Sequence, residues 1–305
     1  MNRVAIIILN WNCADDSIAC AKSILAQTEP SDIIFADNNS SDNSVNKIEY
    51  FINKRNSMYL IKNNKNLGFA GGINSGLRQA LSKKYDYIAL LNPDATADKN
   101  WLKFLVKEMD KHNRCGITTG LMIRSNTNTI DSTGEFYTTW GLPGPRNRDE
   151  PVENAPSKPG EVFGATGGGA IYRAAIFDDI DMFDEDFFMY YEDVDLSFRA
   201  QLAGWKVRFT PKAIAYHKVG ASSKKVPGLA VYNTFKNLPL VFIKNVPGKL
   251  FWYIGLRFFL TYWLIFASAV RHGNGWPAFK GILASIIRKP AAYHKRLSIQ
   301  KNRKV

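Results

Sequence analysis

Three carboxylates stand within four positions of the segment FMYYEDVDLSFRAQLAGW, at Glu192, Asp193 and Asp195. Asp193 could cap a helix over residues 194–203, but capping does not account for Glu192 or for the aromatic residues before it. A carboxylate that lies against aromatic side chains and other carboxylates has a raised pKa, which suits a general base. The two roles are compatible, because one aspartate can cap a helix and also act as a base.

Two other acidic residues directly follow predicted strands. Asp37 begins DNNSSDNS, whose short polar side chains, such as Asn39, can form a turn or bind a nucleoside. Its carboxylate could accept the imide N–H of uracil or thymine. Asp94, in LLNPDA, could hold a divalent cation that bridges two phosphates, or could be a turn residue after Pro93. His217 would add a nitrogen ligand to this site if it lies near Asp94, although a lone histidine is more often a core or surface residue.

A glycine-rich segment, NKNLGFAGGINSG, lies between a predicted strand and a predicted helix and contains Gly68, Gly71, Gly72 and Gly76. Glycines there allow close approach to the backbone and expose amides at a helix N-terminus, which suits phosphate. The segment matches neither G-x-G-x-x-G nor the Walker A sequence. A dinucleotide-binding fold and an NTPase are therefore poorly supported.

Apolar runs bounded by turn residues alternate with amphipathic segments. We expect strands at 4–10, 58–63 and 206–211, strands running into turns at 32–42 and 85–95, and helices at 15–27, 72–83 and 101–112. This alternation predicts an α/β protein with a parallel, doubly wound sheet, whose ligands bind beyond the carboxyl ends of the strands. Residues 140–160 hold five prolines and predict a long mobile loop.

The composition indicates an intracellular protein with an enzyme-sized core. The chain has 305 residues, of which 46% are hydrophobic, so it is not disordered. Its three cysteines, Cys13, Cys20 and Cys115, fit neither a disulfide framework nor a metal-binding spacing, which favours a reducing compartment. The first apolar run has only six residues and indicates a buried strand rather than a signal peptide. We expect the catalytic part to stay in the cytoplasm.

The net charge of +13 is unevenly distributed. Residues 196–305 contain 20 of the 40 Lys and Arg residues and no acidic residue, so residues 1–195 combine the other 20 with all 27 acids. A basic half suggests nucleic acid first. Because the same half holds the most aromatic and apolar run in the chain, an anionic membrane surface is the better partner and nucleic acid is not expected. The composition changes near 225, which predicts a domain over 1–224 and a basic, helical, membrane-associating region over 225–305.

The run over residues 249–270 is long enough to span a bilayer, but Arg257 opposes a span by about 2.5 to 3.5 kcal/mol if it lies at the centre. Polar residues recur every four positions, at Lys249, Tyr253, Arg257 and Thr261. This pattern is typical of a helix that lies in the membrane interface. The alternatives are a true span and a helix packed on the domain or on a second copy of the chain in a homo-oligomer.

Seven segments carry a resemblance: IIILNWN, DNNSSDNS, NLGFAGGINSG, LLNPDA, GATGGGAIYR, YYEDVDLSFRAQLAGW and YHKVGAS. In this order they resemble the inverting family 2 glycosyltransferases with the GT-A fold, which has a Rossmann-like, mixed and mainly parallel sheet. The most similar group is the bacterial rhamnosyltransferase-type enzymes of surface polysaccharide assembly. The likeness covers residues 1–222. Each segment is a weak signal alone, but seven in this order are highly specific.

The resemblance implies a role for each matching residue. Asp193 would be the catalytic base with Glu192 supporting it, and Asp94 with His217 would hold Mg²⁺ or Mn²⁺. Contacts with the donor would come from Asn10, Asp37, Asn39, Gly68, Gly71, Asn92, Gly168, Gly169 and Arg199. Asp37 would contact the base, and the glycines at 167–169 would form a wall beside the sugar. One residue departs from the family pattern, because Asn92 replaces the first acid of D-x-D and should weaken metal binding.

The resemblance also implies partners. The donor would be a dTDP- or UDP-sugar, with dTDP-rhamnose first, and the acceptor a polyprenyl-linked or polysaccharide molecule. The enzyme would act at the cytoplasmic face of the inner (plasma) membrane, as a peripheral or monotopic protein. Two alternatives remain open from the sequence. One is a non-catalytic membrane scaffold on the same fold, and the other is a sugar nucleotidyltransferase, although LNWNCADD lacks the expected glycine-rich triphosphate loop.

Overall fold

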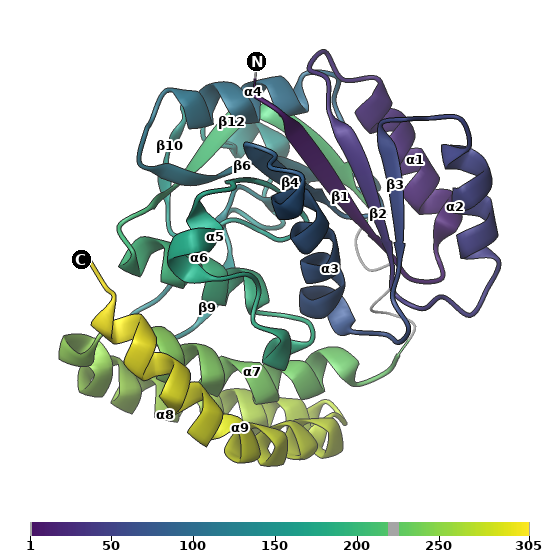
Figure 1. Ribbon diagram of the computed structural model, residues 1–305. Helices are drawn as coiled ribbons and strands as arrows, with labels where there is room; N and C mark the ends of the chain where they lie inside the picture. Colours follow the sequence, from purple (N-terminus) through teal and green to yellow (C-terminus); the bar gives the residue numbers. More distant parts are fainter. Residues whose placement is uncertain (1, 219–225, 305) are drawn as a thin grey trace.

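The computed structural model describes residues 2–218 and 226–304. A mixed sheet in the order β10-β12-β6-β11-β4-β1-β2-β3 forms the centre of the molecule (Figure 1). Its strands are β1 (Val4–Asn10), β2 (Asp32–Asp37), β3 (Met58–Lys62), β4 (Tyr87–Leu91), β6 (Cys115–Arg124), β10 (Gly160–Val162), β11 (Gly169–Arg173) and β12 (Lys206–His217). Two short strands extend it, with β5 (Ala95–Ala97) pairing β12 and β7 (Ile130–Ser132) pairing β6. A separate hairpin joins β8 (Glu135–Tyr137) to β9 (Pro143–Pro145).

The first half of the sheet is parallel, as the sequence predicts. Strand β1 pairs with both β2 and β4 in parallel, and its last residue, Asn10, pairs with Asp37 at the end of β2. The second half is mixed, because β11 runs antiparallel to both β4 and β6. The carboxyl ends of β1, β2 and β4 therefore meet at one edge, where the predicted polar segments follow them.

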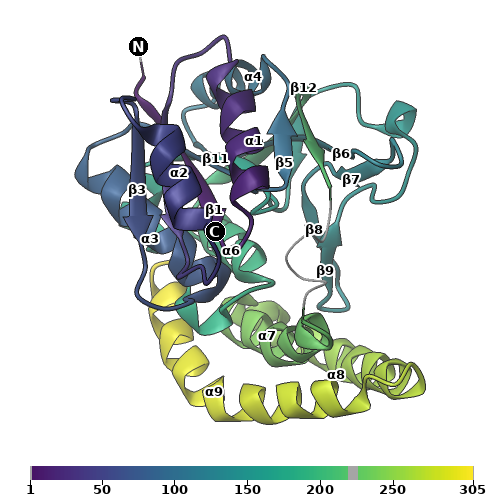
Figure 2. The same ribbon diagram turned by 90° about the vertical axis from the view of Figure 1, so that its right-hand side faces the viewer.

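Helices cover both faces of the sheet, and alternate residues of β1 face each layer. Ile6 and Ile8 pack in one cluster with α1 (Ala14–Leu25), α2 (Ser44–Ile52) and α4 (Trp101–Asp110). Ala5 and Ile7 pack in the other cluster with α3 (Gly68–Ser82), α5 (Ile176–Ile180) and α6 (Glu192–Leu202). Figure 2 shows α1 and α2 in front of the strands. A strand with both faces buried requires a continuous apolar sequence, and VAIIILN supplies one.

Several predicted boundaries need correction. Helix α3 begins at Gly68 rather than near residue 72, so the four glycines lie in the helix and not in a loop before it. Helix α6 begins at Glu192, and its N-cap is Tyr191, so Asp193 lies in the first turn and is not the cap. Gly204, with φ 84°, follows this helix as predicted. The segment over 140–160 contains β9, a 3₁₀ turn η1 (Val152–Asn154) and the start of β10.

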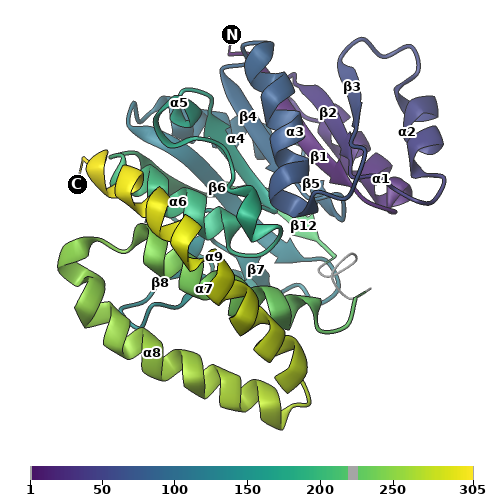
Figure 3. The same ribbon diagram turned by 60° about the horizontal axis from the view of Figure 1, so that its bottom comes forward.

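Three helices complete the described chain: α7 (Leu229–Asn245), α8 (Gly248–Arg271) and α9 (Gly275–Lys301). Helix α7 packs against the α/β layers, and α8 and α9 lie outside it, diverging from their connection in the foreground of Figure 3. One buried cluster joins Phe187, Val194 and Phe198 to Phe235 and Leu238 of α7. The predicted boundary at 224 therefore marks a change in composition but is crossed by a common core.

Candidate active site

Asn10 and Asp37 meet at the carboxyl edge of the sheet. The Asn10 Nδ2 donates to Asp37 Oδ1 over 2.7 Å, and both residues are buried. The backbone N–H of Ser40 donates to Asp37 Oδ2 at 2.9 Å, and its hydroxyl donates to Oδ1 at 2.6 Å. These bonds form the turn that the sequence left as one alternative for Asp37, and its contact with a nucleobase stays a prediction. Asn39 is exposed on this turn, with φ 59°.

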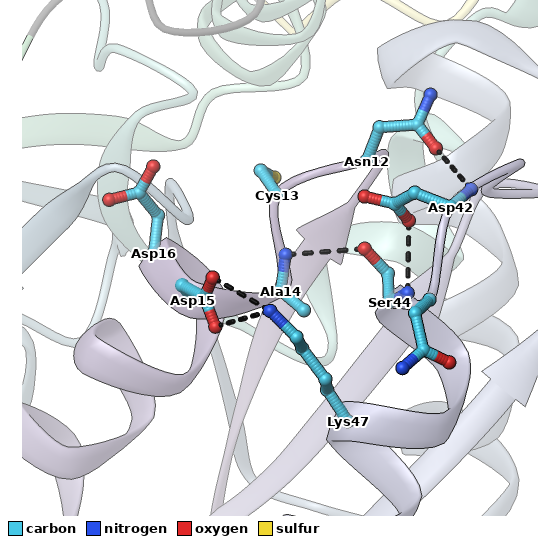
Figure 4. A pocket seen from close by; sticks show the side chains of 9 residues that line it. Asn12, Cys13, Ala14, Asp15, Asp16, Asp42, Ser44 and Lys47 are labelled. Carbon is cyan, nitrogen blue, oxygen red and sulfur yellow. Dashed lines mark hydrogen bonds and ion pairs between the residues drawn. The ribbon is translucent and has the colours of Figure 1, made fainter.

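A pocket of about 440 Å³ opens beside this turn, between the first turns of α1 and α2 (Figure 4). Residues 12–16 line one side, and residues 42–44 with Lys47 line the other. Asn12 connects the pocket to the turn, because its N–H donates to the Ser40 hydroxyl at 2.9 Å. Lys47 pairs with Asp15 at 2.9 Å. A volume of this size suits a small ligand.

His217 and Asp94 come together, as their proposed metal site requires. Strand β12 pairs antiparallel with β5, and this register places His217 opposite Ala95, directly after Asp94. The His217 Nε2 lies 3.1 Å from Asp94 Oδ1. On its other side, His217 Nδ1 lies 2.8 Å from Asp131 Oδ2. The sequence did not indicate Asp131, which reaches the site through the pairing of β7 with β6.

His217 and the carboxylates beside it shift one another's pKa values. Burial alone would lower the pKa of His217, but hydrogen bonds to Asp131 and Asp94 outweigh it and raise the pKa to about 9. Burial would raise the pKa of Asp131, but the bonds from His217 and Arg148 hold it below its usual range. A metal-binding histidine commonly has such a carboxylate on its other ring nitrogen, and the pair offers an imidazole nitrogen and a carboxylate oxygen that suit a divalent cation once His217 loses its proton. Metal binding here stays a prediction. Within the described ranges, no three His, Cys, Asp or Glu side chains form a complete ligand set.

Asp193 lies against the glycines at 167–169. The N–H of Gly167 donates to Asp193 Oδ2 at 2.9 Å, and the N–H of Val194 donates to its Oδ1 at 2.8 Å. The next glycine, Gly168, accepts a 2.9 Å bond from the N–H of Asn92. A Cβ added at Gly168 would lie 3.1 Å from Asn92 Nδ2. This loop therefore brings the end of β4 close to the first turn of α6.

Burial raises the pKa of Glu192 and Asp193 in the first turn of α6 and of Glu135 near them, whereas burial of Asp195 in the same turn is outweighed by Lys244 and Arg199, which lower its pKa. The pKa of Asp193 is raised by burial, although its backbone hydrogen bonds oppose this. The pKa of Glu192 is raised well above its usual value by burial and by the charge of Asp193. The pKa of Glu135 in β8 is also raised well above its usual value, by burial and by the charge of Asp193. In the part of the chain that the structure describes, Oε2 of Glu192 is buried without a hydrogen-bond partner.

Two glycines that were predicted to contact the donor also pack closely against the protein, and their contact with the donor stays a prediction. A Cβ at Gly68 would lie 2.3 Å from the carbonyl oxygen of Phe188, so contact with protein already requires a glycine there. At Gly71 a Cβ would meet the Leu67 side chain at 2.8 Å. Near this helix start, Leu67 N and Gly68 N donate to asparagine side chains, and Ala70 N donates to Phe188 O. These amides are already bonded within the protein.

Arg199 is bonded within the protein, and its predicted contact with the donor stays a prediction. Its side chain is buried and its Nε donates to Asp195 Oδ2 at 2.9 Å. The other guanidinium nitrogens bond to the carbonyl oxygens of Ile180, Asp181 and Met182. Arg199 therefore ties α6 to the end of α5, and its spacing of four residues from Asp195 on the helix was the signal for this pair.

Glu135 and Asp131 are the acidic residues of the site that sequence reasoning missed. Both stand in TIDSTGEF, and both are buried. Two acids close together in a short strand–turn–strand segment were a signal, but their partners lie far away in the chain.

Comparisons with known proteins agree with this geometry. The profile of glycosyl transferase family 2 matches residues 5–181. The chain belongs to glycosyl transferase family 2 and has the GT-A fold. It is 23% identical over 217 residues to the poly-beta-1,6-N-acetyl-D-glucosamine synthase of Staphylococcus aureus, covering 71% of this chain and 50% of that protein. The chain thus spans about half the length of the curated relatives that it matches.

Solved structures show the same fold. GalNAc-T7 with UDP, GalNAc and Mn²⁺ superposes with a TM-score of 0.64 at 17% identity, over 80% of this chain and 48% of that chain. The mannosyltransferase from Pyrobaculum calidifontis, in complex with GDP-Man and Mn²⁺, covers 98% of this chain and 74% of its own, with a TM-score of 0.57 at 15% identity. Family membership sets aside the nucleotidyltransferase alternative, whereas a non-catalytic scaffold on the same fold would match the same profile.

Proposed function

We propose that the protein transfers a sugar, with inversion, from a nucleoside diphosphate sugar to an acceptor hydroxyl in a single displacement. Asp193 accepts the proton of that hydroxyl as its oxygen bonds to the anomeric carbon, and the bond from this carbon to the diphosphate breaks. The observation that supports this proposal is the geometry of Asp193, which is held by Gly167 N at 2.9 Å and is partly exposed. Its raised pKa suits a base.

Of the two neighbouring carboxyl groups, Asp193 would be ionised and Glu192 would be neutral. Glu192 is buried, and burial together with the charge of Asp193 holds its pKa well above the usual value, which favours the neutral form of Glu192 beside an ionised Asp193. Two adjacent carboxyl groups with different pKa values are typical of an acid–base site. Glu192 therefore supports the base by remaining uncharged beside it.

Asp94 and His217 would hold Mg²⁺ or Mn²⁺, with the donor diphosphate providing further ligands. A bound cation would neutralise the charge that develops on the leaving diphosphate. Asp131 would orient His217 through Nδ1, so that Nε2 faces the cation. Both solved structures named above contain Mn²⁺, which supports divalent metal use.

The nucleoside would bind in the pocket between α1 and α2. The pocket carries three aspartates, Asp15, Asp16 and Asp42, and one lysine. Such a lining repels phosphate but can accept hydrogen bonds from ribose hydroxyls and from an imide N–H. We propose dTDP-rhamnose as the donor, with UDP-hexoses next. N-acetylglucosamine, which appears in the name of the staphylococcal relatives, makes its UDP derivative the first of these.

The acceptor would be lipid-linked or a polysaccharide, because the molecule carries a surface that suits a membrane. Among the described residues, one helix, α8, is long and apolar enough to cross a bilayer by length and composition. Only 17% of its 18-residue apolar stretch is buried within the described structure. We define the α8–α9 face by thirteen of the exposed large apolar residues of these two helices: Trp252, Leu256, Phe259, Leu260, Trp263, Leu264, Trp276, Phe279, Leu283, Ile286, Ile287, Tyr293 and Leu297.

The spacing of these residues follows one side of each helix, which favours a helix pair lying on an anionic membrane rather than one spanning helix. Arg257, from the polar stripe of α8, contacts two aromatic rings. Arg257 stacks 3.8 Å over the Tyr253 ring and lies 5.8 Å from the ring of Trp140 beside β9. The enzyme would thus be peripheral or monotopic at the cytoplasmic face of the plasma membrane.

The test is release of nucleoside diphosphate from a panel of donors, with membrane lipid extract and Mn²⁺ or Mg²⁺. We expect lipid-dependent release from one donor and a fall of about 10²- to 10⁴-fold in Asp193→Asn, with donor binding retained. Glu192→Gln is the matched control, because glutamine is close to a neutral glutamic acid and should retain more activity. Full turnover in Asp193→Asn would show that another group is the base.

A further inference from the structure

The backbone just before the proposed base folds through a strained turn. Phe188 has φ 63° and ψ −63°, and the N–H of Met189 donates to Phe187 O at 2.7 Å, so Phe188 is the centre of a γ-turn of the rare kind. Tyr190 and Tyr191 follow with φ of 69° and 70°. Aromatic residues rarely adopt such values, so the surrounding structure must hold them there.

Two consecutive residues of α7, Lys236 and Asn237, bond to this turn. The Lys236 Nζ donates to the carbonyl oxygen of Phe187 at 2.9 Å. The Asn237 Nδ2 lies 3.0, 2.9 and 2.8 Å from three carbonyl oxygens, those of Phe187, Met189 and Tyr190. The carbonyl between them, that of Phe188, accepts the N–H of Ala70 from the start of α3. Each carbonyl from 187 to 190 is therefore bonded to another element.

The side chains of Lys236 and Asn237 are buried, so their polar groups need these hydrogen bonds. Lys236 is 3% exposed and Asn237 is not exposed at all, within a cluster of apolar side chains. Burying an ammonium group or an amide is costly unless it is hydrogen-bonded. Among the described residues, Lys236 Nζ and Asn237 Nδ2 donate to carbonyl oxygens of this turn, which lies about fifty residues earlier in the chain.

The turn in turn fixes the start of α6. The carbonyl oxygen of Tyr191 accepts the N–H of Asp195 at 2.9 Å, which begins the helix that carries Glu192 and Asp193. We propose that Lys236 and Asn237 are positioning residues, which hold the turn over 187–191 so that Asp193 faces the glycines at 167–169. This inference rests on the proposed role of Asp193 as the base.

The test compares two asparagines of α7 in the full-length protein. Asn237→Leu keeps the approximate volume and removes the bonds to the turn. Asn233→Leu is the matched control, because Asn233 is also buried but its Nδ2 bonds to Leu229 O in the same helix. We expect kcat to fall about 10²-fold in Asn237→Leu, with the donor KM within twofold, because a small displacement of a reacting group costs about that much. Asn233→Leu should retain most of kcat.

A second readout separates positioning from general loss of stability. With the turn released, Asp193 should be more exposed to water, and its pKa should fall toward the ordinary value. The acid limb of the kcat profile would then move to lower pH in Asn237→Leu, and it would stay in place in Asn233→Leu. Lys236→Met removes one bond to the turn and should move the acid limb of the kcat profile in the same direction by a smaller amount. If Asn237→Leu does not fold, Lys236→Met takes its place in the test.

Hydrogen exchange gives a result that does not depend on activity. We expect the amides over 187–195 to exchange at least tenfold faster in Asn237→Leu than in Asn233→Leu. Equal exchange and equal kcat in the two variants would overturn the inference. Asp193→Asn, measured in parallel, separates the two proposals. If it retains turnover, the base assignment is wrong, and the exchange data alone then decide whether α7 holds the turn.

Discussion

Lys244 of α7 lies 2.7 Å from Asp195 of α6, and neither side chain is more than 3% exposed. The same ammonium pairs with Asp184 before η2 (Glu185–Phe187). Arg199 and Asn245 donate to the two oxygens of Asp195 at 2.9 and 2.8 Å. The acidic first half of the chain and the basic second half are therefore joined inside the protein, directly behind the helix that carries the proposed base.

Removing this ammonium should destabilise the protein strongly. Lys244→Met leaves Asp184 and Asp195 buried without their main counter-charge, and breaking a buried pair in this way costs about 3–5 kcal/mol. Lys295→Met is the matched control, because Lys295 also pairs with Asp184 but is 41% exposed, where a pair contributes about 0–1 kcal/mol. The free energy of unfolding from urea titration measures both. Equal losses of unfolding free energy in the two variants would show that the buried pairs of Lys244 contribute no more to stability than the exposed pair of Lys295.

Transfer activity should fall at a higher pH than an ordinary aspartate would require. The base must be ionised to accept a proton, and burial raises the pKa of Asp193 above its usual value. As pH falls through this raised pKa, Asp193 gains a proton and kcat/KM declines. We expect the acid limb of kcat/KM clearly above pH 4, near which an exposed aspartate titrates. A limb at or below that pH would contradict the burial of the carboxylate in the free enzyme.

Asp131 should influence metal binding although it lies on the far side of His217. Asp131→Asn removes the carboxylate that orients the imidazole, and loss of such a partner typically lowers metal affinity about 10- to 100-fold. Asp149→Asn is the control, because Asp149 is exposed and pairs with Arg124, which also lies 3.5 Å from Asp131. Mn²⁺ binding in the presence of UDP, followed by electron paramagnetic resonance, is the measurement. An unchanged affinity in Asp131→Asn would remove Asp131 from the site.

The sequence predicted what local patterns control. Strand β1 was predicted at 4–10, its observed bounds, because an apolar run ends there in a polar residue. The start of α3 was missed because glycine is a poor helix former. A Cβ at Gly72 would lie 2.5 Å from the Leu9 side chain, and one at Gly76 would lie 2.7 Å from that of Ile7, so packing on β1 requires these glycines inside the helix.

The rest depended on contacts between distant segments. Asp131 reaches His217 only because β7, β6 and β12 are neighbours in the sheet, and this register is not visible in any local window. The burial of the Arg199 guanidinium at the end of α5 could not be foreseen either, because its carbonyl partners lie about eighteen residues earlier in the chain. The same holds for Asn237, whose partners lie about fifty residues earlier in the chain.

The α8–α9 face should bind anionic vesicles, and its most exposed leucines should account for much of the affinity. Leu256 and Leu264 are 69% and 70% exposed, two turns apart on the same side of α8. Burying a leucine fully is worth about 1.5–3 kcal/mol, so Leu256→Gln with Leu264→Gln should weaken binding about a hundredfold or more.

Co-sedimentation with vesicles of phosphatidylglycerol and phosphatidylcholine measures this effect. Tyr50→Gln is the matched control, because Tyr50 is 85% exposed on α2, outside the α8–α9 face, and should not change binding. High salt should release the wild type in part, since the basic residues that flank the face are screened while its apolar contacts are not. Binding that needs detergent for release would instead favour α8 as a span, and equal binding by the double variant and the wild type would exclude this face as the contact.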